Sequence, residues 1–117
     1  MHNIWVVNKS VHIPTENDFY IGRGSALGNP YTSQELEKTK ATFKCSSKEE
    51  AIDSYKKYLN KKIKNKDKDI CDKLNEIYLR VLESDAYLVC YCKPKMCHGD
   101  FIKGILLAKI IKFLMKK

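Results

Sequence analysis

Residues 86–101 read AYLVCYCKPKMCHGDF, and this stretch decides the fold because it joins a strand to the start of a helix. Its first part, Ala86 to Cys92, is almost continuously apolar, which is typical of a buried strand in a parallel sheet. A loop with lysines and a proline follows. A helix is then predicted to begin near Cys97–Gly99 and to continue through DFIKGILLAKIIKFLM. A strand, a loop and a helix in this order predict one unit of an α/β fold.

Segments earlier in the chain extend this pattern. Ile4 to Val7 and Phe19 to Ile21 predict two further short strands. Ser47 and Glu50 form a capping box that predicts the start of a long amphipathic helix, and the apolar spacing from Ile70 to Leu82 predicts a second one. We therefore expect a Rossmann-like α/β domain with a small, mainly parallel sheet flanked by helices.

Two polar segments are expected between these elements. Thr32 and Glu35 fit a capping box, which predicts a short helix after Pro30. The charged stretch KKIKNKDKD, residues 61–69, predicts a solvated connection between the two longer helices.

The composition limits what kind of protein this is. With 117 residues, the chain is long enough for one domain, residues 1–117, and too short for two. No apolar run is long enough to span a bilayer and no signal-peptide pattern is present, so we expect a cytoplasmic protein. In that reducing compartment its five cysteines should be thiols or metal ligands rather than disulfides.

The charge predicts anionic partners. The net charge is +8, and of the 22 basic residues only Arg23 and Arg80 are arginines. Such an excess favours phosphorylated small molecules, nucleic acid or acidic surfaces. A guanidinium is the side chain best suited to grip a phosphate or carboxylate with two parallel hydrogen bonds, which draws attention to the two arginines.

The segment from Cys97 to Asp100 is the first candidate site. Ligands of open α/β sheets bind beyond the carboxyl ends of the strands, and a helix start offers unpaired N–H groups to an anion. Gly99 would let a ligand or another backbone approach, and Lys93 and Lys95 would add positive charge. Asp100 fits a second role equally well, that of satisfying amides in the first helical turn.

The cysteines allow three interpretations. Cys90, Cys92, Cys97 and His98 offer four zinc ligands, but a C-x-C pair on an extended strand separates its sulfurs by about 6–7 Å, too far for an easy pair. Cys90 and Cys92 also fit a buried strand as small apolar residues. Cys97, at a helix start beside an imidazole, fits either a reactive thiol or a structural cysteine. No cofactor is expected, with zinc as the alternative.

The stretch YIGRGSALGNPYT, residues 20–32, is the second candidate site. Its glycines and proline predict tight turns with exposed backbone, but its spacing matches neither a Walker loop nor a dinucleotide-binding loop. Arg23 between two glycines, with Ser25 and Asn29 nearby, favours an anion site. A surface loop with a solvated arginine is the alternative.

Together, IGRG-x-x-x-GNP and C-x-C-K-P-x-x-CHGD resemble the motifs of one family, domain of unknown function 4326, along nearly the whole chain. The family occurs in phages, bacteria and some eukaryotic viruses, and this lysine-rich chain is most similar to phage members. The resemblance implies a compact α/β domain but no activity. SQELEKTKATFKCS stands here where many bacterial members carry a G-x-D-G-T-R-like stretch. The motif positions are Gly22, Arg23, Gly24, Gly28, Asn29, Pro30, Cys90, Cys92, Lys93, Pro94, Cys97, His98, Gly99 and Asp100.

We expect the two motifs to form one pocket for a phosphorylated, nucleotide-like small molecule, such as an ADP-ribose-type signal in a phage context. The expected ligand-binding residues are Gly22, Arg23, Gly24, Ser25, Gly28, Asn29, Lys93, Cys97, His98, Gly99 and Asp100. An enzyme acting on such a nucleotide through His98, Cys97 and Asp100 is the alternative, followed by a basic nucleic-acid-binding or zinc-stabilised module. Self-association through the C-terminal helix is also expected, and the compartment would be the host cytoplasm if the protein is viral.

Overall fold

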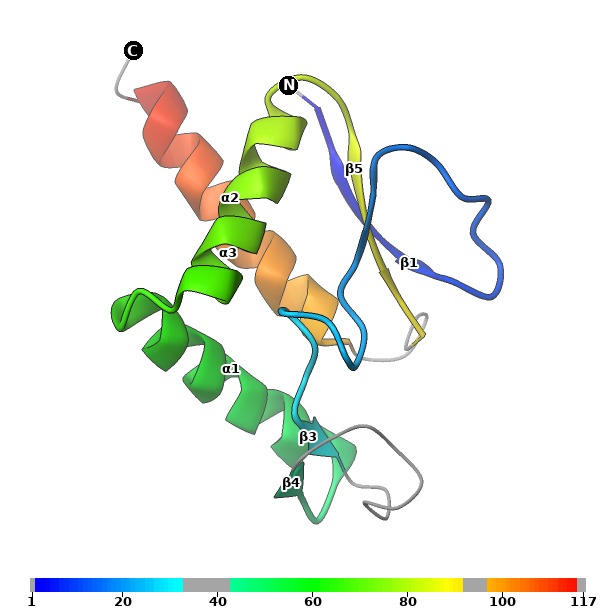
Figure 1. Ribbon diagram of the computed structural model, residues 1–117, viewed down its shortest axis with the longest axis vertical. Helices are drawn as coiled ribbons and strands as arrows, with labels where there is room; N and C mark the ends of the chain where they lie inside the picture. The colour runs from blue at the N-terminus through cyan, green and yellow to red at the C-terminus, as the bar shows by residue number, and fades with distance from the viewer. Residues whose placement is uncertain (1, 33–42, 92–96, 116–117) are drawn as a thin grey trace.

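The computed structural model describes residues 2–32, 43–91 and 97–115, and within them the chain forms strands and helices in α/β order (Figure 1). The elements are β1 (Ile4–Asn8), β2 (Asp18–Tyr20), β3 (Tyr31–Thr32), β4 (Phe43–Lys44), α1 (Lys48–Lys64), α2 (Lys68–Val81), β5 (Ala86–Cys90) and α3 (His98–Met115). The predicted α/β class is confirmed.

The main sheet has three parallel strands in the order β1-β5-β2. The last strand in the sequence therefore lies in the centre, with Ile4 opposite Ala86 on one side and Phe19 opposite Leu88 on the other. β5 ends at Cys90 rather than at Cys92, because the chain bends at Tyr91, and Cys92 lies outside the described residues. The small parallel sheet was predicted; its strand order was not.

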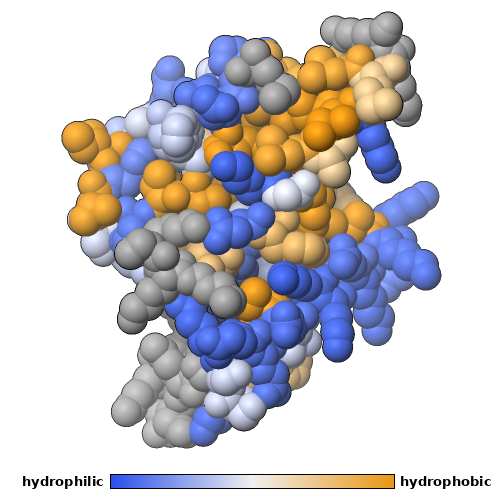
Figure 2. Space-filling model, turned by 180° about the vertical axis from the view of Figure 1, so that it is seen from behind, coloured by the Kyte–Doolittle hydropathy of each residue, from blue (hydrophilic) through white to orange (hydrophobic). Residues whose placement is uncertain are grey.

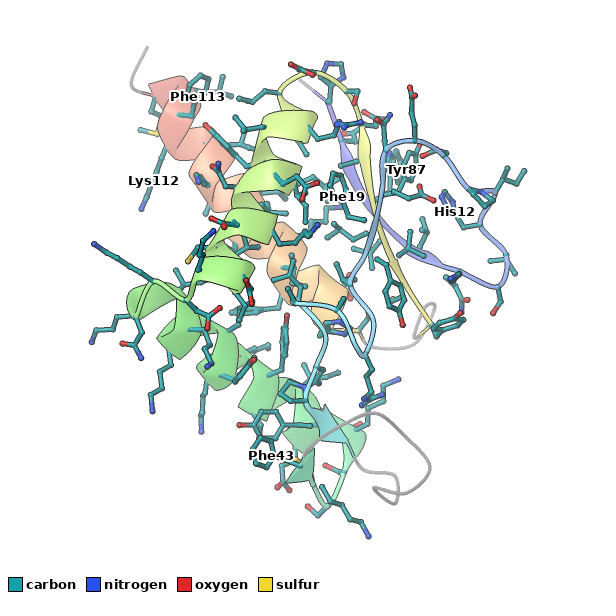
Figure 3. All side chains as sticks on the ribbon, in the orientation of Figure 1. His12, Phe19, Phe43, Tyr87, Lys112 and Phe113 are labelled. Carbon is teal, nitrogen blue, oxygen red and sulfur yellow. The ribbon has the colours of Figure 1, made fainter. Side chains whose placement is uncertain are left out.

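The helices pack on one face of this sheet. Alternate residues of each strand point to that face. Ile4, Phe19 and Leu88 join the hydrophobic core together with residues of all three helices. On the other face the ring of Tyr87 contacts His12 of the loop after β1, and Figure 3 shows both on the side away from Phe19. A Rossmann-like domain carries helices on both faces, so that part of the expectation is not confirmed.

α1 begins at its predicted cap, Ser47, whereas α2 begins at Asp67, a cap that the sequence analysis did not predict. The side chain of Ser47 accepts a hydrogen bond from the amide of Glu50 at 3.1 Å, and that of Asp67 accepts one from Ile70 at 3.1 Å. The stretch from 61 to 69 is only partly a connection, because α1 continues to Lys64 and its last turn is lysine-rich. Lys66 turns the chain between the helices with a φ of 58°.

A second, two-stranded sheet was missed by the sequence analysis. β3 pairs with β4 in parallel, with Tyr31 opposite Phe43. Thr32 is therefore part of a strand, and Glu35 and the predicted short helix that would follow lie outside the described residues. Because β3 contacts α1, this small sheet builds a wall beside the helix (Figure 1).

α3 carries apolar residues around most of its circumference, as predicted. Ile102, Leu106 and Ile110 are buried in the core, whereas Ile111 and Leu114 are exposed near the end of the helix. Figure 2 shows apolar surface next to the chain's C-terminal end. Self-association through this helix stays a prediction. Across the described residues, none of the helices combines the length and apolar character that crossing a membrane requires.

Candidate functional site

The two sequence motifs meet at the carboxyl ends of β2 and β5. The chain leaves β2 at Ile21 and enters the glycine-rich loop, and α3 begins at His98. The imidazole Nε2 of His98 lies 2.6 Å from the carbonyl oxygen of Ile21, which is 77 residues earlier in the chain. The structure thus brings the start of α3 against the start of the glycine-rich loop.

His98 is a buried, neutral residue at this junction. Its Nε2 carries the proton, because it can only donate to the carbonyl oxygen of Ile21. The edge of the imidazole meets the ring of Tyr55 with centroids 5.0 Å apart. Burial lowers the pKa of His98, and this effect outweighs the hydrogen bond to Ile21, which raises it. The side chain joins α1, α3 and the end of β2.

Cys97 is also buried, and its sulfur is held within the protein. It lies 3.0 Å from the sulfur of Cys90 and 3.9 Å from Nδ1 of His98, and it accepts a hydrogen bond from the amide of Gly99 at 3.3 Å. Cys97 therefore links the end of β5 to the first turn of α3.

The same cysteines were the proposed zinc alternative. Two sulfurs that share one tetrahedral zinc ion lie about 3.8 Å apart, given Zn–S bonds of about 2.3 Å. The sulfurs of Cys90 and Cys97 lie 3.0 Å apart, and either thiol can donate to the other. Within residues 2–32, 43–91 and 97–115, no three His, Cys, Asp or Glu side chains are arranged to hold a metal ion. Cys92, Lys93 and Lys95 lie outside the described residues.

Gly99 and Asp100 take different positions in the first turn of α3. A Cβ on Gly99 would lie 2.8 Å from side-chain carbons of both Ile21 and Val6, so the missing side chain lets α3 pack closely on β1 and the end of β2. Asp100 is exposed, and its amide donates to the carbonyl of Cys97 at 3.1 Å. Of the three predicted catalytic residues, only Asp100 is open to solvent.

The glycine-rich loop is folded on its own backbone. The hydroxyl and the amide of Ser25 both donate to the carbonyl of Gly22, at 2.6 and 3.2 Å, and the amide of Gly28 donates to the carbonyl of Ser25 at 3.0 Å. Gly24 is exposed and adopts a φ of 90°, which favours glycine. A Cβ on Gly28 would collide with the carbonyl oxygen of Gly22, so this position also needs a glycine.

Arg23 is the charged residue at the centre of this loop. Its Nη2 donates to the carbonyl of Tyr31 at 2.9 Å. Its Nε is buried and has no hydrogen-bond partner among the residues that the structure describes. A buried N–H without a partner is costly, so an acceptor that reached this nitrogen would stabilise the protein.

Asn29 and Tyr55 join the glycine-rich loop to α1 through hydrogen bonds. Asn29 is buried; its amide nitrogen donates to the carbonyl of Ala51 at 3.2 Å, and its oxygen accepts from the amide of Tyr31 at 2.9 Å. Tyr55 is fully buried and donates to the carbonyl of Leu27 at 2.7 Å. The sequence indicated Tyr55 only as an apolar position of a helix, and it indicated Asn29 as a ligand contact rather than a support.

Only some of the predicted ligand-binding residues thus line the same hollow. Gly24 and Ser25 line a hollow of about 520 Å³ against α2, where Asp69, Asp72, Lys73 and Glu76 form the other wall. Cys97, His98 and Gly99 pack beneath the loop instead of facing this hollow. The start of α3 therefore holds the loop in place.

The comparisons with known proteins agree with the motifs. The family model named Domain of unknown function (DUF4326) matches residues 6–108, which include the end of β1, the whole of β5 and most of α3. No curated protein and no solved structure matched the chain. Because the matched region covers most of the chain and contains both motifs, this protein belongs to the DUF4326 family.

Proposed function

We propose that the protein binds a phosphorylated, nucleotide-like small molecule at the loop from Gly22 to Asn29, with Arg23 as the anchor. The observation that carries this proposal is the buried Nε of Arg23, which has no hydrogen-bond partner in the described part of the chain. A phosphate or carboxylate oxygen would accept that hydrogen and would meet a full positive charge.

The surroundings of Arg23 suit a ligand that is anionic at one end and rich in hydroxyls at the other. Gly24, the next residue in the chain, is exposed and has no side chain, so an anion could approach its backbone. The hollow next to it carries the carboxylates of Asp69, Asp72 and Glu76. Carboxylates accept hydrogen bonds from sugar hydroxyls and repel phosphate, so we expect the sugar on the side of α2 and the phosphate on Arg23.

Binding without chemical change is the function that the geometry favours. The imidazole of His98 already donates to Ile21 and the thiol of Cys97 is buried, so neither group meets solvent. We assign both a positioning role for the loop. The setting that we propose is the cytoplasm, or the host cytoplasm for a viral protein, because nucleotide-derived signals are found there.

The test is a thermal-shift and native mass spectrometry panel of ADP-ribose, NAD derivatives and cyclic nucleotides with three proteins. These are the wild type, Arg23→Lys and Arg80→Lys, each of which keeps the net charge. We expect Arg23→Lys to weaken binding by about tenfold or more, because charged hydrogen bonds contribute about 1.5–3 kcal/mol each. Arg80 donates to Glu16 and Asn17 far from the loop, so Arg80→Lys should bind normally.

The same panel contains the results that would overturn the proposal. Equal ligand shifts in the wild type and Arg23→Lys, or no shift with any nucleotide, would remove Arg23 as the anchor. A stoichiometric zinc ion in the native mass spectrum would favour the zinc-stabilised alternative. A nucleotide recovered in altered form would instead favour an enzyme.

A further inference from the structure

A groove between α1 and the small β3–β4 sheet lies outside both sequence motifs. It encloses about 650 Å³. Its walls carry the aromatic rings of Tyr31, Phe43 and Tyr58 and the ammonium groups of Lys57, Lys61 and Lys62. One carboxylate, that of Asp67, and the polar side chains of Ser54 and Asn65 complete the lining. Aromatic rings beside cations are the combination with which proteins hold bases and phosphates.

The aromatic wall is assembled from three separate parts of the chain. Tyr31 of β3 and Phe43 of β4 stack with centroids 5.1 Å apart and planes 28° apart. Tyr58 of α1 meets Tyr31 edge-on, with centroids 6.2 Å apart. Phe43 is 50% exposed, so one ring of this group is open to a partner (Figure 3). A flat, partly exposed ring is a stacking platform for a base.

The lysines form a row on the same face of α1. Lys57 and Lys61 are four residues apart, and Tyr58 and Lys62 form the neighbouring row with the same spacing. Lys62 pairs weakly with Asp67 at 3.7 Å, whereas no described acidic residue pairs with Lys57 or Lys61. Figure 2 shows hydrophilic side chains gathered on the surface over α1. Within the described part of the chain, the groove therefore offers an anion two ammonium groups, those of Lys57 and Lys61, that no carboxylate pairs with.

We propose that this groove binds a single strand of nucleic acid, with a base stacked on the ring of Phe43 and phosphates held by Lys57 and Lys61. The rings would stack on base faces, which a duplex hides and a single strand exposes. The basic row from Lys57 to Lys64 runs for about 10 Å, the length of seven residues of helix, and so spans several successive phosphates. Arg23 bonds to the backbone of Tyr31 but does not line the groove, and this proposal does not depend on the function proposed above.

The first test measures fluorescence anisotropy of labelled DNA and RNA strands of about 12 nucleotides, at several salt concentrations. We expect the double variant Lys57→Gln/Lys61→Gln to weaken binding by about tenfold at low salt. Its slope of log affinity against log salt should also fall by about 1.4, which is about 0.7 for each lost contact. The control is Lys56→Gln/Lys112→Gln, which removes the same charge from exposed residues outside the groove, with Lys112 on α3 (Figure 3).

The second test concerns the ring. Phe43→Leu keeps an apolar side chain but removes the platform, so we expect binding to weaken about fivefold or more. Trp5→Leu removes a comparably exposed ring from the other face of the main sheet and should leave binding unchanged. Thermal melts confirm that each variant is folded.

Four results would overturn the proposal. The two lysine double variants could lose the same affinity, which would mean that only net charge matters. Phe43→Leu could bind as tightly as the wild type. A duplex of the same sequence, or inorganic polyphosphate, could compete as well as the strand. A mononucleotide could compete at a concentration as low as that of the unlabelled strand, which would make the groove a small-molecule site. Selective loss in Lys57→Gln/Lys61→Gln and in Phe43→Leu supports it, and comparison of the DNA and RNA strands identifies the preferred sugar.

Discussion

His98 shows how one buried side chain can join motifs that lie far apart in the sequence. Its hydrogen bond to Ile21 and its ring contact with Tyr55 connect α3 to the end of β2 and to α1. A motif histidine next to a cysteine resembles a catalytic pair in sequence. The side chain of His98 is nevertheless hydrogen-bonded within the protein, because its Nε2 donates to a backbone carbonyl.

The burial of His98 has a consequence for stability against pH. Its folded pKa is lower than the ordinary value of about 6.5, so below that pH the unfolded chain binds a proton that the folded protein does not. Stability is therefore complete above about pH 6.5 and falls as the pH drops, by at most about 1.4 kcal/mol per pH unit for one group.

Urea denaturation of the wild type and His98→Gln at pH 7.5 and pH 5 checks this prediction. Glutamine can donate to Ile21 but has no titrating group, so the wild type should lose more stability than the variant on acidification. His2 and His12 are present in both proteins and their contributions cancel. Equal losses would show that His98 titrates alike in the folded and unfolded states.

At the scale of elements, we expect alanine substitutions at two glycines to change the stability of the protein in opposite directions. Gly28→Ala places a Cβ against the carbonyl oxygen of Gly22, within the loop, so we expect a loss of about 1–3 kcal/mol. Gly104→Ala lies on the exposed side of α3 with no atom within 4 Å of the new Cβ, so we expect a gain of about 0.5–1 kcal/mol.

Thermal and urea denaturation of the two alanine variants measures this contrast. A ligand that binds the loop should also bind Gly28→Ala more weakly and Gly104→Ala normally. A stable Gly28→Ala variant would mean that the loop relaxes around the new methyl group without cost.

The helices and strands were predictable where the information is local. Ser47 and the periodic apolar residues of α1 and α2 act within a few residues of each other, and the structure places both helices as expected. The β3–β4 pair was not predictable, since two-residue strands show no period. The aromatic wall of the groove was missed for the same reason, because it depends on that pairing to bring Phe43 to Tyr31.

The meeting of the two motifs was predictable, but the position of the hollow and the contacts were not. The rule that ligands meet the carboxyl ends of parallel strands led us to expect the glycine-rich loop at the start of α3, where the structure has it, whereas the hollow beside the loop lies against α2. It could not show that His98 would bond to Ile21 or that Tyr55 would hold Leu27, because those partners lie 77 and 28 residues away. The unpartnered Nε of Arg23 likewise follows only from the folded arrangement.

At the scale of the whole molecule, the strand order governs how the fold is assembled. β1 and β2 are both edge strands, and the strand between them comes more than 60 residues after β2. All strand pairs of the main sheet are therefore long-range, and such contacts form late because loop closure costs entropy before they stabilise anything.

During synthesis, the first 85 residues would thus leave the ribosome with β1 and β2 unpaired and with α1 and α2 lacking the main sheet. We expect a fragment of residues 1–85 to unfold without a cooperative transition, and a peptide of residues 86–117 to restore that transition when added in excess. Circular dichroism melts of the fragment, alone and with the peptide, measure this transition. Cooperative melting of the fragment alone would contradict the prediction. The segment that carries the CHGD motif is then also the one that completes folding, so a newly made chain acquires its structure and its candidate site in the same step.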